Sequence, residues 1–342
     1  MFTRLRLPTV LLTTLLVAAC GTGATTAPTA APASTAPAAS TPASAAASVA
    51  ASAAPSAAAS TAASAGATQA AASPVAISAS CMKGQALTLT SGTLTIGTDN
   101  PAYPPYFQPD ASTAPKPWKL GDPTNGQGFE SAVAYAVAGK LGYSQSDVKW
   151  IVVPFDNSYA PGKKAFDFYL AQVSYTAQRA TAVDMSDGYY YVAQSIVALK
   201  GNPITSARTI GDLKTYKLGA MQGTTAYTAI KSVIAPTATV SVYSSNDDAI
   251  AAVKAKQIDG IVTDLPTAFY ITAVQLDNSV IVGQLPVTPG PNAEHFSLVL
   301  AKGSPLTTCV NQAIASLKAD GTLDQITKEW LADKASAPVL QP

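Results

Sequence analysis

The sequence has little of the chemistry on which most enzymes depend. Its 342 residues include one histidine, His295, and three cysteines. These residues form no cluster with metal-ligand spacing, and no nucleophile-elbow pattern occurs in the chain. We therefore predict a protein that is not an enzyme, with no catalytic residue, metal or cofactor, in which His295 is a structural or surface residue.

Charge is also scarce. Lys, Arg, Asp and Glu make up 12% of the chain, and the formal net charge is +1. No basic cluster occurs, so the sequence gives no support for nucleic acid as a partner.

The first residues have the organisation of an export signal. Arg4 and Arg6 precede a short apolar run that ends at Cys20, and this run is too short to span a membrane as a stable helix. We predict a signal peptide over residues 1–19. The ending Leu-Val-Ala-Ala-Cys-Gly is similar to a lipobox, which implies a lipid on Cys20 and anchoring to the outer face of the cell membrane. An ordinary signal peptide that leaves a free Cys20 is the alternative.

A segment without charged or aromatic residues follows. From Gly21 to Ser80 the chain consists almost entirely of Ala, Ser, Thr, Pro and Gly. Such a segment lacks the large apolar side chains that would offset the entropy lost on ordering. We predict that residues 20–80 form a disordered tether.

The remaining cysteines, Cys81 and Cys309, lie near the two ends of the predicted folded body. An even number of cysteines in an exported protein suggests a disulfide, here between the start of the domain and a late helix. Two separate buried thiols are the alternative.

Strand and helix patterns alternate through the folded body, which indicates an α/β fold. The stretch from Phe166 to Val173 has the alternation of a mostly buried strand, and Ser174 and Arg179 follow it. Open α/β sheets bind ligands at such strand ends, where Arg can hold a carboxylate with two parallel hydrogen bonds. A surface arginine paired with Asp184 or Asp187 is the alternative. We expect further strands at 87–97, 148–154, 194–200, 217–221, 257–264 and 295–302, and helices at 128–141, 246–256, 306–320 and 323–333.

The spacing Asp167-x(6)-Ser174-x-Thr176-x-x-Arg179-Ala180, followed by Val183-Asp184-x-Ser186-Asp187-Gly188-Tyr189-Tyr190, resembles the signature of bacterial extracellular solute-binding proteins of family 3. These proteins are the polar amino-acid receptors of ABC importers. The resemblance implies a type II periplasmic-binding-protein-like fold with two lobes, two crossover segments and a ligand cleft between the lobes. Lobe 1 would comprise residues 81–194 and 296–333, lobe 2 residues 195–295, and the tail residues 334–342.

The resemblance also implies the roles of particular residues. In the family, the arginine at the place of Arg179 and the Gly-Thr-Thr at Thr224 and Thr225 bind the α-carboxylate of the ligand, and the aspartate at the place of Asp264 takes the ammonium. The other ligand-binding residues that we predict are Ser174, Tyr103, Gln172, Asp99 and Phe155.

Some of these residues also have a purely structural interpretation. Tyr103 beside its prolines could be core packing, Thr225 could be only a helix N-cap, and Asp264 could cap the helix that Pro266 begins.

The function that follows is a monomeric binding protein that captures a small zwitterion, an amino acid above all, by lobe closure and delivers it to an ABC permease in the membrane. A tethered sensor or adhesin with the same fold and a dehydratase-type enzyme are the alternatives. The loop 108–126 is longer than the usual turn, and the sequence leaves open whether it is a lid or a partner surface.

Overall fold

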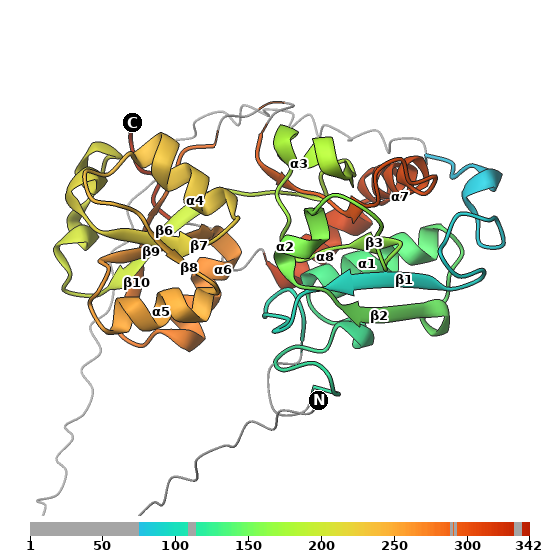
Figure 1. Cartoon of the computed structure of the whole chain (residues 1–342), viewed down its shortest axis with the longest axis horizontal. Helices are drawn as coiled ribbons and strands as arrows, with labels where there is room; N and C mark the ends of the chain where they lie inside the picture. Colours follow the sequence, from blue (N-terminus) through green and yellow to red (C-terminus); the bar gives the residue numbers. More distant parts are fainter. Residues whose placement is uncertain (1–74, 109–113, 288–289, 291–292, 332–336) are drawn as a thin grey trace, which may run out of the picture. The chain divides into compact units, whose positions relative to one another are not determined.

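Two five-stranded sheets organise the part of the chain that the computed structural model describes, which comprises residues 75–108, 114–287, 290, 293–331 and 337–342. These residues all belong to one unit, 67–342. The predicted signal peptide, Cys20 and nearly all of the predicted tether lie outside the described residues. We call the first sheet with its helices lobe 1 and the second sheet with its helices lobe 2 (Figure 1).

The sheet of lobe 1 has the order β2-β1-β3-β12-β4. Strands β1 and β2, and β1 and β3, are parallel, whereas β12 is antiparallel to β3 and β4. The strands are β1 (Leu94–Thr98), β2 (Val148–Val152), β3 (Phe168–Tyr169), β4 (Asp184–Met185) and β12 (Val299–Leu300).

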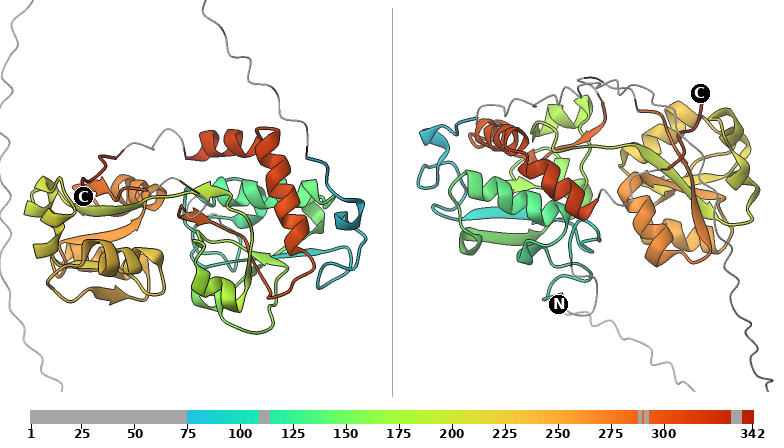
Figure 2. Two further views of the ribbon diagram at one scale, coloured as in Figure 1. Left: turned by 90° about the horizontal axis from the view of Figure 1, so that it is seen from above. Right: turned by 180° about the vertical axis from the view of Figure 1, so that it is seen from behind.

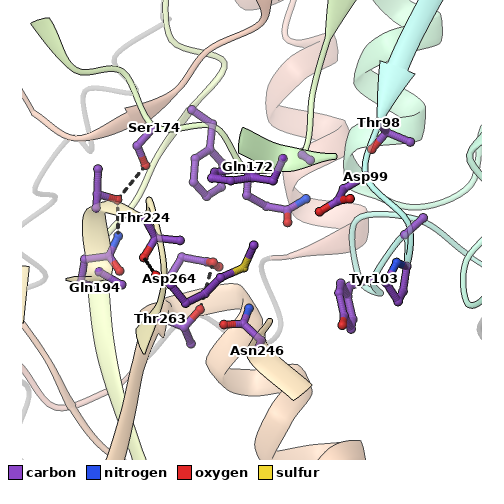
Figure 3. A pocket seen from close by; sticks show the side chains of 18 of the residues that line it. Thr98, Asp99, Tyr103, Gln172, Ser174, Gln194, Thr224, Asn246, Thr263 and Asp264 are labelled. Carbon is purple, nitrogen blue, oxygen red and sulfur yellow. Dashed lines mark hydrogen bonds between the residues drawn. The ribbon is translucent and has the colours of Figure 1, made fainter. Parts of the chain in front are cut away.

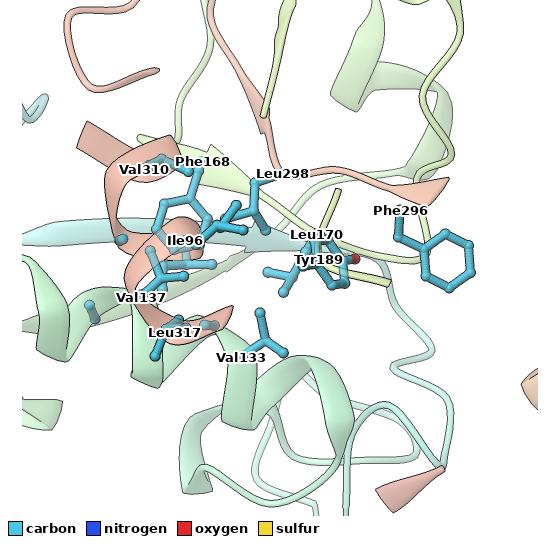
Figure 4. Close-up of a cluster of buried hydrophobic side chains, with 14 of the residues drawn as sticks. Ile96, Val133, Val137, Phe168, Leu170, Tyr189, Phe296, Leu298, Val310 and Leu317 are labelled. Atoms are coloured by element: carbon cyan, nitrogen blue, oxygen red, sulfur yellow. The ribbon is translucent and has the colours of Figure 1, made fainter. Parts of the chain in front are cut away.

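Three helices of lobe 1 pack against one another over the sheet, namely α1 (Phe129–Lys140), α7 (Thr307–Ala319) and α8 (Thr322–Trp330). Figure 2 shows this group from two further sides. Apolar side chains from α1, α7 and the strands fill the space beneath them, including Ile96, Val137 and Leu317 (Figure 4). Each such side chain contributes roughly 1.5–3 kcal/mol when fully buried.

Short helices complete lobe 1 and the segment that precedes it. They are α2 (Phe155–Tyr159), α3 (Ala177–Ala182) and the 3₁₀ turns η1 (Ala79–Cys81), η2 (Pro123–Asn125) and η3 (Gln145–Asp147). A disulfide joins Cys81 to Cys309 in α7, with 5.3 Å between their Cα atoms. The predicted bridge is therefore present, and it ties the N-terminal segment to lobe 1.

The sheet of lobe 2 has the order β10-β6-β9-β7-β8. Strands β7, β8 and β9 are parallel, and β6 is antiparallel to β9 and β10. The strands are β6 (Gln194–Leu199), β7 (Leu218–Met221), β8 (Ser241–Tyr243), β9 (Gly260–Asp264) and β10 (Ser279–Gln284).

Helices cover both faces of this second sheet. Helix α4 (Thr225–Ala229) continues into the π-helix η6 (Ile230–Ile234) and packs on one face. Helix α5 (Asn246–Lys254) and helix α6 (Leu265–Tyr270), which continues into the π-helix η7 (Ile271–Gln275), pack on the other. The 3₁₀ turns η4 (Pro203–Ser206) and η5 (Gly211–Thr215) connect β6 to β7.

Two segments run side by side between the lobes. Strand β5 (Tyr190–Tyr191), which leads into β6, pairs antiparallel with β11 (His295–Phe296), which leads back to β12. Two crossover segments between α/β lobes are the arrangement that we expected.

The last residues of the chain pack on lobe 2, although helix α8 before them belongs to lobe 1. Val339 and Gln341 form β-bridges to Gln284 and Thr209, and Leu340 is only 1% exposed in the lobe 2 core. The residues that the sequence presents as a tail thus contribute to this lobe.

Several strands are shorter than the sequence predicts. The strand expected over 166–173 forms a ladder only at Phe168 and Tyr169, and it ends before Gln172, whose backbone is left-handed with φ of 54°. The strand expected over 87–97 begins at Leu94, after Gly92 turns the chain with φ of 75°. The strand expected over 295–302 is divided into β11 and β12.

Candidate functional site

A pocket between the two sheets is lined by residues that come mainly from strand ends and helix starts. Its described lining includes all nine residues that we predicted as ligand-binding: Asp99, Tyr103, Phe155, Gln172, Ser174, Arg179, Thr224, Thr225 and Asp264. It also includes polar residues that the sequence did not single out: Thr98, Gln194, Asn246 and Thr263. Figure 3 shows Asp99 and Tyr103 across the pocket from Ser174, Gln194 and Asp264.

Arg179 is buried at this site, with 7% of its surface exposed. It lies on α3, where Thr176 caps the helix by accepting a hydrogen bond from the Arg179 amide at 3.1 Å. Its guanidinium donates to the carbonyl of Ser174 at 2.5 Å and to that of Gly223 at 2.7 Å. Its Cζ atom lies 4.4 Å from the centroid of the Tyr159 ring. Stacking on Tyr159 and two hydrogen bonds orient the guanidinium. Burial lowers the pKa of Arg179, but the guanidinium stays charged because the pKa of an arginine is far above neutral pH.

The alternative of a surface arginine paired with Asp184 or Asp187 is wrong. Asp184 instead lies 3.4 Å from Lys302 Nζ and accepts a hydrogen bond from Thr307 Oγ1 at 2.9 Å. Among the described residues, Arg179 has no carboxylate within ion-pair distance. A buried cation without an ion-pair partner can bind an anionic group of a ligand.

Asp264 lies where strand β9 ends and helix α6 begins. Its Oδ1 atom accepts a hydrogen bond from the Thr267 amide at 2.9 Å, so the predicted N-cap is present. Tyr106, from lobe 1, donates its phenolic proton to the same oxygen. Desolvation by burial raises the pKa of Asp264. Oδ1 thus accepts two hydrogen bonds, whereas Oδ2 accepts one, from Thr263 Oγ1 at 3.4 Å. Oδ2 is therefore the oxygen with capacity left for a ligand.

The two threonines at the start of α4 have different roles. Thr224 is the N-cap, because its hydroxyl accepts from the Tyr227 amide at 3.3 Å and donates to the Met221 carbonyl at 2.7 Å. The interpretation of Thr225 as only a cap is therefore wrong. The Thr225 hydroxyl instead donates to Glu294 at 2.5 Å.

Glu294 was missed by the sequence analysis. It precedes β11 on the second crossover segment, and its Oε1 atom accepts from Ser174 Oγ at 2.7 Å, Thr225 Oγ1 at 2.5 Å and Gln194 Nε2 at 2.9 Å. Donors from both lobes thus meet at one carboxylate oxygen. No periodicity or motif marks Glu294, so the sequence offered no signal for it.

The opposite end of the pocket is acidic. Asp99 follows β1 and accepts a hydrogen bond from the Asn100 amide at 2.8 Å. Burial, with a smaller contribution from nearby Asp156, raises the pKa of Asp99. Tyr103 donates to Asp247 of lobe 2 at 2.9 Å, which is a more specific contact than the core packing considered for it.

Gln172 and Phe155 complete the pocket on the side of lobe 1. Glu130, which is fully buried, accepts the backbone amide of Gln172 at 2.7 Å and is also bonded to its side-chain amide. These bonds hold Gln172 in its left-handed backbone conformation. The ring centroid of Phe155 lies 5.5 Å from Arg179 Cζ, so this aromatic packs beside the cation.

The arrangement is suited to binding a small polar molecule. Of the charged residues in the described lining, Arg179 is positive, whereas Asp99 and Asp264 are negative. No group of three or more His, Cys, Asp or Glu side chains among the described residues could hold a metal ion. No helix among these residues is long and apolar enough to cross a membrane.

Comparison with known proteins identifies the relatives of the chain. The family model for bacterial extracellular solute-binding proteins, family 3, matches residues 94–333. The glutamine-binding protein of an ABC transporter of Bacillus subtilis is 31% identical over 168 residues, which are 49% of this chain and 58% of that protein. The arginine-binding extracellular protein of the same organism is 27% identical over 221 residues, 63% of this chain and 82% of that protein.

The solved structures that resemble this chain are also of amino-acid-binding proteins. An ancestral arginine-binding protein bound to glutamine has 30% identity and a TM-score of 0.57, with 71% of this chain and 99% of that chain covered. The same kind of protein bound to arginine has 29% identity and a TM-score of 0.56, with 70% and 99% covered. The two-lobed type II fold predicted from the sequence is confirmed, and these relatives are binding proteins rather than enzymes.

Proposed function

Because the chain belongs to the bacterial extracellular solute-binding proteins of family 3, we propose that it captures a small zwitterion, a polar amino acid above all, between its two lobes. The observation that carries this proposal is the presence of Arg179 from lobe 1 and Asp264 from lobe 2 in the lining of one pocket. The guanidinium would hold the α-carboxylate, and the Oδ2 atom of Asp264 would hold the ammonium.

Closure of the lobes follows from this division of contacts. A ligand that binds groups on both lobes interacts more strongly with the state in which they meet, so it shifts the population toward that state. In this proposal residues 81–194 and 296–333 move as one body and residues 195–295 as the other. Ser174, Thr224, Thr225 and Gln172 contact the ligand near its charged groups, and Tyr103 and Phe155 pack against it.

The charges of the lining favour a polar or cationic side chain on the ligand. A zwitterion leaves the carboxylate of Asp99 without a counter-charge, whereas a positively charged side chain would balance it. The relatives reported above are consistent with this range, since they bind glutamine or arginine.

We further propose that the protein is exported, that Cys20 carries a lipid, and that residues 20–80 tether a monomeric receptor to the outer face of the cell membrane. The closed receptor would deliver its ligand to an ABC permease. The sequence of the leader and the family of the chain support these steps.

Calorimetric titration of the full chain with the twenty amino acids tests the binding function, after endogenous ligand has been removed by partial unfolding. We expect tight binding of one or a few amino acids. Arg179→Ala and Asp264→Asn should each weaken it at least 100-fold, because each leaves a charged group of the ligand buried without a partner. Arg208→Ala, which removes an exposed arginine of lobe 2, is the matched control. A folded protein that binds none of the amino acids would overturn the proposal.

A further inference from the structure

The side-chain hydroxyls of Ser174 and Thr225 both donate their protons to one carboxylate, that of Glu294. Ser174 and Thr225 each have one hydroxyl proton, and both hydroxyls donate to Glu294 Oε1, at 2.7 and 2.5 Å. An ionised carboxylate can only accept hydrogen bonds, so the direction of these two bonds is fixed by chemistry. Glu294 itself is not part of the described lining of the pocket, whereas Ser174 and Thr225 are.

Gln194 is constrained in the same way. Its Nε2 atom donates to Glu294 at 2.9 Å and to Thr225 Oγ1 at 3.2 Å, which uses both of its protons. Its Oε1 atom is buried and has no hydrogen-bond partner among the described residues, although Gln194 lines the pocket and only 5% of the residue is exposed. Figure 3 shows Ser174 and Gln194 on the same side of the pocket, with dashed hydrogen bonds beside them.

The consequence is a wall that can accept hydrogen bonds but cannot donate them through its side chains. The hydroxyl oxygens of Ser174 and Thr225 are left with lone pairs for the pocket, and Gln194 has a buried carbonyl oxygen without a donor. A buried acceptor without a donor is costly, and a ligand that supplies N–H groups would recover this cost.

We propose that Glu294 is a positioning residue that turns Ser174, Thr225 and Gln194 into acceptors, so that this wall, together with Asp264, selects the ammonium of the ligand and rejects a carboxylate. The inference rests on the proposed function, because it names how the zwitterion is oriented. The ligand carboxylate is then left to Arg179 and to backbone amides, so the carboxylate contact that the resemblance implies for Thr225 would come from its backbone amide and not from its hydroxyl.

Affinities of Glu294 variants for matched probes test this role. The probes are arginine and its des-amino analogue 5-guanidinopentanoate, which lacks the ammonium but keeps the carboxylate and the side chain, with glutamine as a third probe. We expect the wild type to prefer arginine to the analogue at least 100-fold, and Glu294→Ala to reduce this ratio at least tenfold. The preference between arginine and glutamine should not change, because the side-chain end of the pocket is intact.

Glu294→Gln separates proton orientation from charge. The amide oxygen of the variant can still accept both hydroxyl protons, so its ratio should lie between those of the wild type and Glu294→Ala. Equal ratios in the two variants, or a parallel loss of affinity for arginine and the analogue, would overturn the proposal. Glu329→Ala, which removes an exposed glutamate of α8, is the control.

Neutron diffraction from crystals of the ligand-free, deuterated protein gives an answer that requires no ligand. The deuterons of Ser174 Oγ and Thr225 Oγ1 should lie on the lines to Glu294 Oε1. Deuterons directed into the pocket would refute the inference even if amino acids bind. If no amino acid binds the wild type, the proposed function fails, whereas the neutron map still decides the role of Glu294.

Discussion

Tyr106 of lobe 1 donates its phenolic proton to Asp264 of lobe 2. Tyr106 is fully buried, and its carbonyl accepts the Glu130 amide at the start of α1 at 3.0 Å. Gly128 also lies close to this carbonyl: a Cβ atom on Gly128, whose φ is 94°, would lie 2.6 Å from the carbonyl oxygen of Tyr106. The backbone of lobe 1 thus fixes the Tyr106 hydroxyl against Asp264, which we propose holds the ligand ammonium.

Tyr106→Phe should weaken amino-acid binding about tenfold with little change in the stability of either lobe. The hydrogen bond joins the two lobes, so its loss penalises only the state in which they meet, and bonds to charged groups contribute roughly 1.5–3 kcal/mol. Calorimetry with the ligand found in the amino-acid panel measures the effect. Tyr216→Phe, in lobe 2 and outside the pocket lining, is the control. An affinity within twofold of the wild type would contradict the prediction.

Asp99→Asn should change the choice among amino acids rather than binding as such. Asp99 has no ion-pair partner among the described residues, and burial raises the pKa of its carboxyl. A cationic side chain would stabilise its charged form. We expect the affinity for arginine to fall about tenfold relative to that for glutamine, measured by competition, because about 1.4 kcal/mol of charge pairing is lost. Asp277→Asn on the exposed surface should leave the ratio unchanged, and a ratio unaltered by Asp99→Asn would refute the role.

Glu130 should make the folded protein less stable as the pH rises from about 5 to 8. Desolvation by burial raises its pKa to about 7, against the bonds from Tyr189 and Gln172, which lower it. The folded state then binds more protons than the unfolded state. The contribution of Glu130 to the free energy of unfolding is therefore complete below the pKa that Glu130 has in the unfolded chain, and it is lost as the pH rises through 7. This contribution is at most about 3 kcal/mol.

Thermal unfolding across this pH range measures the slope. In Glu130→Gln the fall of Tm with rising pH should be smaller than in the wild type, whatever the absolute Tm. The same slope in both proteins would show that Glu130 does not titrate in this range.

Loss of the disulfide should destabilise the unit by about 2–5 kcal/mol. Cys81 and Cys309 are 228 residues apart in sequence, so the bridge closes a long loop and restricts the unfolded chain strongly. Urea unfolding of Cys81→Ser/Cys309→Ser, compared with the wild type in reducing and non-reducing buffer, measures the change. The midpoint of the wild type should fall toward that of the variant on reduction, and equal midpoints in all samples would contradict the prediction.

Leu340→Ala should destabilise lobe 2 by about 2–4 kcal/mol, because it opens a cavity where the last residues pack on the core. Val339 beside it is 50% exposed, so Val339→Ala should cost less than about 0.5 kcal/mol. Hydrogen exchange of β6 and β10 distinguishes the variants. Unchanged protection of these strands in Leu340→Ala would show that the C-terminal segment does not support the lobe.

The residues that sequence reasoning could find are those at strand ends. Arg179, Asp264 and Thr225 follow recognisable strands, and the ends of parallel strands meet at one edge of a sheet, so their convergence on one pocket follows from topology. Their binding role stays a prediction. The fold class followed from the same pattern of alternating elements.

The residues that it could not find act through side-chain geometry rather than through pattern. Tyr106 stands beside Phe107 and two prolines, where an aromatic indicates packing, and its bond to Asp264 depends on how two distant segments meet. Glu294 and Leu340 lie outside any periodic element. Gln172 interrupts its strand because a buried carboxylate holds its backbone, which no local propensity encodes.

The two ends of the described chain are held on different lobes. Cys81 is bonded to α7 of lobe 1, whereas Leu340, two residues from the C-terminus, is buried in lobe 2. A fluorescent donor fused near the first end and an acceptor fused after Pro342 would therefore each report the position of one lobe. The two ends of the described chain thus provide the attachment points of an optical sensor, in which energy transfer would respond to the ligand without any label inside the fold.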